Sequence, residues 1–195
     1  MRIRPGRCAA LVVGAVAVVI AAGACGGATS SGSTEPEATI AASAAPSIPD
    51  WYGFAMTDVR TGQTFTIGDF AGKVVLIEGM AQWCPNCRAQ EDEVIKLHEM
   101  LGNPGDLVSV SLDVDVNEDD ASLRKYAASL GYDWYFAVAP LAVARALGNL
   151  YSAQFLNPPV APMLLIDRDG RAYGLPYGLK SAEALRLTVE PYLTR

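Results

Sequence analysis

The apolar run KVVLIEGM at residues 73–80 restricts the fold more than any other stretch of this chain. Its β-branched and aliphatic residues are nearly continuous rather than alternating with polar ones. That pattern is typical of a strand buried on both faces, at the centre of a sheet that helices cover on both sides. The run leads directly into AQWCPNCRAQ, so whatever chemistry the two cysteines perform is located at the end of a central strand.

The remaining elements alternate between strands and helices. Two short strand-like runs at 54–58 and 63–67 are joined by a turn signal and predict an N-terminal β-hairpin. Further strands are expected at 107–114, 134–139, 163–167 and 171–176, and helices at 85–101, 118–131, 141–148 and 181–193. This order predicts an α/β fold: one domain over residues 50–195 with a central mixed β-sheet flanked by helices on both faces.

The first 24 residues have the pattern of a secretory signal peptide. Three arginines lie within the first seven residues, and an apolar run follows at 11–22. The alternative is a retained transmembrane helix, which needs roughly 20 apolar residues. The run has only 12. We therefore expect residues 1–24 to be removed on export.

Cys25 follows the small residues at 22–24, which resemble the lipobox of bacterial lipoproteins. Residues 26–49 are almost wholly Gly, Ala, Ser, Thr and Pro, a composition that suits a flexible tether. We expect residues 25–49 to be a lipid-attachment cysteine and a flexible linker, which would anchor the domain to the outer face of the cytoplasmic membrane. Cleavage without lipidation, giving a secreted protein, is the alternative.

The charge of the exported part argues against a nucleic-acid partner. Without the three leader arginines, 12 Lys and Arg remain against 21 Asp and Glu. A surface this acidic gives no electrostatic reason to bind nucleic acid.

Only Cys84 and Cys87 remain as cysteines of the folded part, because Cys8 lies in the leader and Cys25 at its end. A disulfide-stapled scaffold needs more pairs. Zinc sites built on Cys-x-x-Cys need a second pair of ligands. The one histidine, His98, lies eleven positions along the same expected helix, too far to share a metal with the pair. We expect no metal.

A redox pair fits the position of the two cysteines. Cys84 directly precedes a helix, whose unpaired N–H groups and dipole favour a thiolate. The thiolate is the attacking species in disulfide exchange. Cys87 follows by nearly one helical turn, so we expect Cys84 to be the nucleophile and Cys87 the resolving thiol.

The segments GKVVLIEGMAQWCPNCRAQ and APMLLIDRDGRAYG resemble the TlpA/ResA-type branch of the thioredoxin superfamily. These are membrane-tethered thiol–disulfide oxidoreductases that face out of the bacterial cytoplasm. The resemblance extends over residues 54–193. It implies a thioredoxin-like fold, no cofactor other than the Cys84–Cys87 disulfide, protein thiol or disulfide substrates, and a membrane-bound redox partner. We expect a monomer.

The resemblance also assigns site residues. Trp83, Cys84 and Cys87 match the active-site motif. Pro162 matches the family's cis-proline, which packs beside the dithiol, although an X-Pro bond alone would be expected to be trans. The peptide groups of Ala161 would then be free to pair with a substrate strand. The alternative is a proline that merely ends a loop with Pro158 and Pro159.

Two positions depart from the TlpA/ResA pattern. That branch carries asparagine six residues before the first cysteine and glutamate three after the second, where this chain has Glu78 and Gln90. An acid at the first position resembles thioredoxin itself, in which it serves proton transfer. Burial should raise the pKa of Glu78, which could then accept the proton of Cys87. The alternative is that Glu78 reaches solvent near the end of the sheet.

Several functions compete at this stage. Family analogy favours a reductant, for example in cytochrome c maturation, over an oxidant that forms disulfides in exported proteins. A Sco-like copper chaperone needs Cys-x-x-x-Cys and a distant histidine, whereas this chain has one residue fewer between its cysteines and no histidine after His98. A peroxiredoxin-like peroxidase needs a hydroxyl residue where Ala81 stands. A non-enzymatic binding module requires that the dithiol is never reduced.

Overall fold

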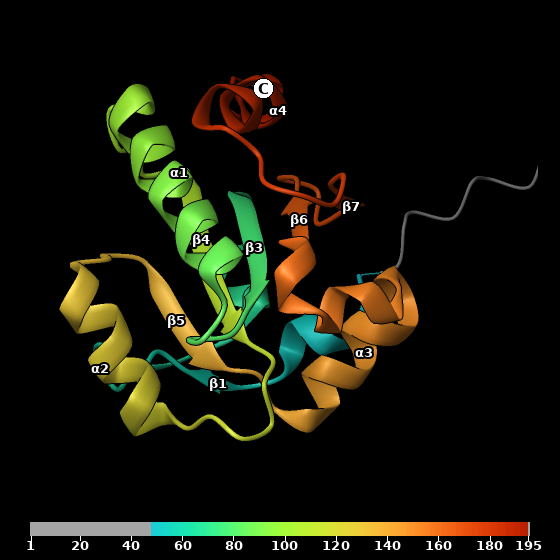
Figure 1. Ribbon diagram of the computed structural model, residues 1–195. Helices are drawn as coiled ribbons and strands as arrows, with labels where there is room; N and C mark the ends of the chain where they lie inside the picture. The colour runs from blue at the N-terminus through green and yellow to red at the C-terminus, as the bar shows by residue number, and fades with distance from the viewer. Residues whose placement is uncertain (1–47, 195) are drawn as a thin grey trace, which may run out of the picture. The chain divides into compact units, whose positions relative to one another are not determined.

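The computed structural model describes residues 48–194 and has a five-stranded sheet in the order β5-β4-β3-β6-β7 (Figure 1). The central strand β3, Val74–Met80, is buried at all seven of its residues, as the continuous apolar run predicts. Its neighbours are β4, Leu107–Asp113, and β6, Met163–Ile166. The outer strands are β5, Tyr135–Val138, and β7, Ala172–Gly174.

The sheet is mixed. Strands β3, β4 and β5 run parallel, with Val74 opposite Leu107. Strand β6 runs antiparallel to β3 and places Met163 opposite Glu78. Strand β7 completes an antiparallel hairpin with β6. The residues that follow β3 and those that precede β6 therefore meet at the same end of the sheet, because these two central strands are antiparallel neighbours.

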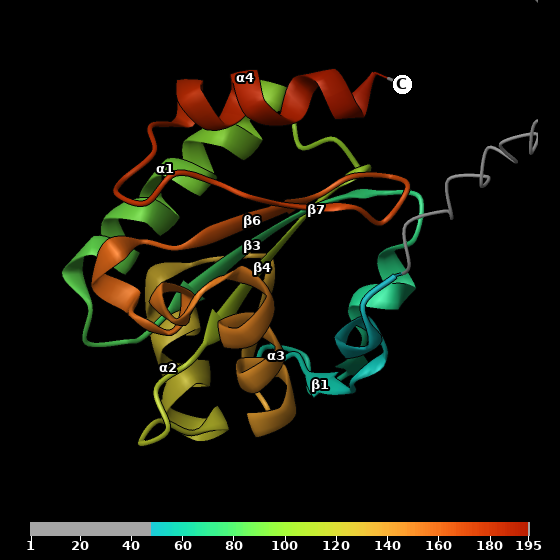
Figure 2. The ribbon, with the colours of Figure 1, turned by 90° about the vertical axis from the view of Figure 1, so that its right-hand side faces the viewer.

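Helices cover both faces of the sheet. Helices α1, Pro85–Leu101, and α4, Ala182–Leu193, lie on one face, and α3, Leu141–Tyr151, lies on the other (Figure 2). Helix α2, Asp120–Leu130, adds two buried residues to the cluster under α1 and α4. The side chains of β3 alternate accordingly: Leu76 and Met80 lie in that cluster, and Ile77 lies in the cluster under α3.

The predicted N-terminal hairpin is confirmed as a separate small sheet. Strand β1, Met56–Thr57, pairs antiparallel with β2, Thr64–Phe65. The second strand of the hairpin is shorter than the sequence predicts, because residues from Ile67 onward form a 3-10 helix that Thr66 caps. The hairpin is joined to the main sheet where the N–H of Val59 donates to the carbonyl of Phe136.

Helix α3 is longer than its predicted end at Gly148. It continues to Tyr151, and Gly148 lies inside it, where a Cβ would come 3.1 Å from the Cδ1 of Leu156. Close packing, rather than helix termination, therefore explains this glycine. Two short 3-10 helices that the sequence did not predict follow, Ala153–Leu156 and Pro158–Val160. They carry the chain to the start of β6.

The expected leader at 1–24, the lipidation candidate Cys25 and most of the linker lie outside the described residues and stay predictions. Between residues 48 and 194, no helix is both long enough and apolar enough to cross a membrane.

Candidate active site

The dithiol lies where β3 passes into α1. Cys84 is the N-cap of α1, and Pro85 occupies the first helical position, where a missing N–H costs nothing. The Sγ of Cys84 accepts a hydrogen bond of 3.3 Å from the backbone N–H of Cys87. The expected placement of Cys84 at a helix start, with Cys87 one turn along, is confirmed.

Both cysteines are free thiols and both are buried, with 1% and 0% of the surface of Cys84 and Cys87 exposed. The Sγ of Cys87 donates to the carbonyl of Pro158 at 3.5 Å. Burial raises the pKa of the Cys87 thiol, and a hydrogen bond with Cys84 raises it further. Cys87 is therefore a protonated thiol in the reduced protein.

The segment before β6 forms one wall of the site. Asn86, inside the Cys-Pro-Asn-Cys motif, donates from Nδ2 to the carbonyl of Pro159 at 2.7 Å. The carbonyl of Pro162 accepts from the N–H of Gly79 at 3.0 Å. A Cβ at Gly79 would lie 2.7 Å from the carbonyl oxygen of Phe155 and 3.2 Å from Pro162, so only glycine allows this approach.

The peptide groups of Ala161 are not free, and that expectation is wrong for this structure. Ala161 is fully buried, with a left-handed backbone at φ 45°. Its N–H donates to the carbonyl of Pro158 at 2.8 Å, and its carbonyl accepts from the Nζ of Lys180 at 2.7 Å. The short 3-10 turn and a lysine from a distant segment occupy both groups. The cis isomer of the bond to Pro162 stays a prediction.

Lys180 is a site residue that the sequence analysis missed. Its Nζ also donates to the carbonyls of Pro176 and Gly178. Burial lowers its pKa to about 8, against the opposing attraction of Glu78. The backbone of Lys180 exchanges two hydrogen bonds with the buried side chain of Gln90, at 2.8 and 3.0 Å. Gln90, which replaces the family's glutamate, therefore fastens the Lys180 segment to α1.

Trp83 is held against the loop that follows β4. The residue is 58% exposed, and its Nε1 donates to the Oδ2 of Asp115 at 2.7 Å. The neighbouring Gln82 bonds to the same region through the carboxylates of Asp113 and Glu118. Trp83 is thus a fixed apolar surface beside the dithiol.

Glu78 is buried, with 2% exposure, so the alternative of a carboxylate reaching solvent is wrong. It lies between Leu76 and Met80 on the strand face that α1 and α4 cover. Neither carboxyl oxygen has a hydrogen-bond partner among the described residues. Burial raises its pKa well above the usual value, repulsion from Glu91 adds to this, and attraction to Lys180 opposes it. The role of Glu78 in proton transfer stays a prediction.

Glu91 is a second buried acid that the sequence analysis missed. It lies on α1 and is fully buried, and its Oε2 accepts a hydrogen bond of 2.5 Å from the hydroxyl of Tyr126. Burial raises its pKa to about 7, although hydrogen bonds from Tyr126 and Tyr132 lower it. A signal was present, because Glu91 precedes Val94 by three residues and so interrupts the apolar stripe of this helix.

His98 is partly buried on α1, where its side chain contacts Ser109 and Trp134. Its Nε2 lies 2.8 Å from the Oγ of Ser109, and its ring stacks on Trp134. Among residues 48–194, no group of three His, Cys, Asp or Glu side chains is arranged to hold a metal ion.

Comparison with protein-family models shows which family this chain belongs to. The family model described as Redoxin matches residues 32–177, most of the chain. The chain belongs to the Redoxin family. This Redoxin-family protein is an oxidoreductase with the thioredoxin-like fold that the sequence predicts. A search of curated protein sequences finds no significant match.

Solved structures share the fold of this Redoxin-family protein at low sequence identity. A thioredoxin-family thiol:disulfide interchange protein from Chlorobium tepidum matches with a TM-score of 0.58 and 20% identity, over 72% of this chain and 92% of that one. A secreted Mycobacterium tuberculosis disulfide oxidoreductase, homologous to E. coli DsbE, gives 0.55 and 15%, over 71% and 95%. A DsbF homologue from Corynebacterium diphtheriae gives 0.54 and 20%, over 70% and 82%.

Proposed function

We propose that this protein is an extracytoplasmic thiol–disulfide oxidoreductase that exchanges disulfides with protein substrates through Cys84 and Cys87. The observation that carries the proposal is the capping geometry of Cys84. Its sulfur lies at the N-terminus of a 17-residue helix and accepts the N–H of Cys87. A negative sulfur is favoured in that position by the helix dipole and by the hydrogen bond.

The reaction divides into two exchanges. The thiolate of Cys84 attacks a substrate disulfide, forming a mixed disulfide and releasing one substrate thiolate. Cys87 then loses its proton and attacks the Cys84 sulfur, which forms the Cys84–Cys87 disulfide and releases the second substrate thiolate. Two electrons pass from the dithiol to the substrate. Glu78, buried close to both thiols, is the proposed acceptor of the Cys87 proton.

A direct test uses insulin as the substrate. The wild-type protein with excess dithiothreitol should accelerate precipitation of the reduced insulin B chain, and both Cys84→Ser and Cys87→Ser should abolish the acceleration. Copper titration and peroxide consumption address the Sco-like and peroxiredoxin-like alternatives in parallel. Stoichiometric copper binding or peroxide turnover without insulin reduction would overturn the proposal.

The proposed direction in the cell is reduction of exported proteins, for example apocytochrome c before haem attachment. It rests on the resemblance to TlpA/ResA-type proteins, and formation of disulfides in exported proteins is the alternative. The equilibrium reduction potential separates them. A value of about −270 mV, as in thioredoxin, supports a reductant, and one of about −120 mV, as in DsbA, supports an oxidant.

The proposed location is the outer face of the cytoplasmic membrane, with Cys25 acylated and a membrane-bound partner that recycles the dithiol. The signal-like start, the small residues before Cys25 and the polar linker support it. Expression in a bacterium with a clickable palmitate analogue should label the wild-type protein in the membrane fraction. Cys25→Ser should lose the label, and a wild-type protein that is unlabelled and fully soluble would contradict the anchor.

A further inference from the structure

Glu91 has no role in the exchange reaction as proposed, although it is buried in the site. It follows Cys87 by four residues on α1, so the two side chains lie on the same face of the helix. Its Oε1 and both oxygens of Glu78 have no hydrogen-bond partner among the described residues. Unpaired buried carboxyls are costly, and they concentrate at sites that hold or move protons.

The protonation of Glu78 creates a difficulty for proton transfer. Burial and repulsion from Glu91 raise the pKa of Glu78 well above its usual value, and this favours the protonated carboxyl. A protonated carboxyl cannot take a second proton from Cys87. Glu78 can act as the acceptor only if its own proton first moves to a neighbour.

Glu91 is placed to be that neighbour. It is the acid whose repulsion acts on Glu78, and its Oε2 is already engaged by Tyr126, which leaves Oε1 to take a proton. With a pKa of about 7, Glu91 gains and loses a proton near neutral pH. Glu78 also borders a cavity of about 10 Å3 with Ser109 and Ser111, close to the smallest volume that holds one water.

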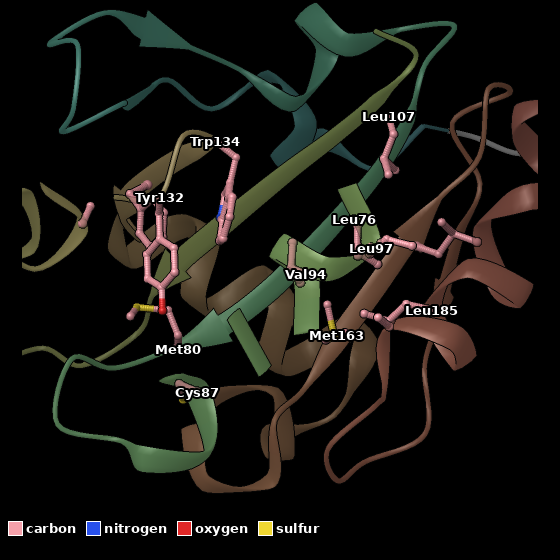
Figure 3. Packing of buried hydrophobic residues seen from close by; sticks show 14 of the residues in the cluster. Leu76, Met80, Cys87, Val94, Leu97, Leu107, Tyr132, Trp134, Met163 and Leu185 are labelled. Carbon is pink, nitrogen blue, oxygen red and sulfur yellow. The ribbon is translucent and has the colours of Figure 1, made fainter. Parts of the chain in front are cut away.

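The charged and titratable groups around the two acids come from several elements. They are Arg88 and Asp92 on α1, Tyr126 on α2, Tyr132 before β5, Lys180 before α4, and the two thiols of the site. Figure 3 shows Tyr132 and Cys87 within one buried cluster. Tyr126 donates its hydroxyl hydrogen bond to the Oε2 of Glu91 and so helps to orient the second acid.

We propose that Glu91 receives the proton of Glu78, which allows Glu78 to accept the proton of Cys87 while Cys87 resolves the mixed disulfide. This rests on the proposed exchange reaction. The bond between the Cys84 and Cys87 sulfurs forms, the bond between Cys84 and the substrate sulfur breaks, and that sulfur leaves as a thiolate. One proton moves from Cys87 to Glu78, and one moves from Glu78 to Glu91. Glu91 is thus a positioning residue that acts on Cys87 through Glu78.

The kinetic test measures single-turnover oxidation of the reduced protein by saturating oxidised glutathione between pH 5 and pH 9. In the wild type, the resolution rate should rise through an inflection near pH 7. Glu91→Gln should lose the inflection and be slower at pH 7 by about tenfold or more, within the range of general acid–base effects. Glu99→Gln, on the exposed side of the same helix, is the matched control and should behave as the wild type. A Glu91→Gln variant that keeps the inflection and a rate within about twofold of the wild type would overturn the proposal.

Two further variants test whether the acids act in series. The double variant Glu78→Gln/Glu91→Gln should be no slower than Glu78→Gln alone, because a relay fails completely when either member is removed. If the rate losses of the two single variants instead multiply in the double variant, the two acids act independently and the relay is overturned. Tyr126→Phe removes a hydrogen bond that lowers the pKa of Glu91, so the inflection should move to higher pH.

A titration independent of activity separates this inference from the proposed function. In protein with 13C-labelled glutamate side chains, Glu91→Gln should lower the pKa of Glu78 by removing a repulsion, while burial keeps it above its usual value. An unchanged Glu78 titration would overturn the relay even in an active enzyme. A wild-type protein that exchanges no disulfide would instead overturn the proposed function, whatever the titration shows.

Discussion

The Nζ of Lys180 donates a hydrogen bond of 2.7 Å to the carbonyl of Ala161, the residue that precedes Pro162. The two residues lie on different sides of the β6–β7 hairpin, so this bond holds the start of β6 to the segment before α4. The same ammonium binds the carbonyls of Pro176 and Gly178. One half-buried cation therefore holds the wall of the dithiol site that residues 158–162 form, called the proline wall below.

Lys180→Met should destabilise the protein and loosen this wall. The substitution keeps much of the side chain's apolar volume but leaves backbone carbonyls without a donor, a loss of about 1–3 kcal/mol. The free energy of unfolding in urea gives the magnitude, and hydrogen exchange at the amide of Ala161 should become faster. Lys125→Met on the exposed side of α2 is the control. If the two substitutions change the free energy of unfolding and the exchange at Ala161 equally, Lys180 does not hold the segment before β6 in place.

The two thiols should react at different rates with iodoacetamide. Burial raises the pKa of Cys87. At a pH below the pKa, each unit by which the pKa rises lowers the fraction of reactive thiolate about tenfold. Cys84 in the Cys87→Ser variant should therefore be alkylated at least about tenfold faster at pH 7 than Cys87 in the Cys84→Ser variant. Peptide mapping by mass spectrometry also identifies which sulfur forms a mixed disulfide with glutathione. Preferential labelling of Cys87 would exchange the roles of nucleophile and resolving thiol.

Gly79→Ala should be damaging although both residues are small. The new Cβ would lie 2.7 Å from the carbonyl oxygen of Phe155, a contact that forces the backbone to move at a cost of about 1–3 kcal/mol. Because the shift also displaces Pro162, insulin reduction should fall along with the melting temperature. Gly105→Ala, where no atom lies within 4 Å of the added group, is the matched control. If both variants have the melting temperature of the wild type, the close approach at Gly79 does not constrain the structure.

The pH dependence of stability should show the raised pKa of Glu91. A carboxyl with a higher pKa in the folded than in the unfolded state binds its proton more tightly when folded, so its contribution falls as pH rises from about 4.5 to about 7. Glu91→Gln removes this penalty. Its stability relative to the wild type should rise across that range by up to roughly 3 kcal/mol and then level off. Urea unfolding at pH 5, 6, 7 and 8 tests this, and a difference that does not change with pH would contradict the buried, titrating carboxyl.

The sequence by itself determined the framework of this protein. The continuous apolar run at 73–80 required a strand buried on both faces, and the alternation of strands and helices around it required the mixed sheet with helices on both sides. Local chemistry also determined the position of Cys84, because Pro85 and the helix pattern fix where α1 begins. These features depend on neighbours in the chain.

Only the tertiary structure decided which groups meet at the dithiol. Glu91 interrupts an apolar stripe visible in the sequence, but its bond to Tyr126 depends on how α2 packs against α1. Lys180 is separated by 19 positions from Ala161, and the pairing of both Ala161 peptide groups follows from a turn and a hairpin that no local pattern specified. Burial and long-range hydrogen bonds arise from packing between elements, and they set both the protonation of the two acids and the closure of the proline wall.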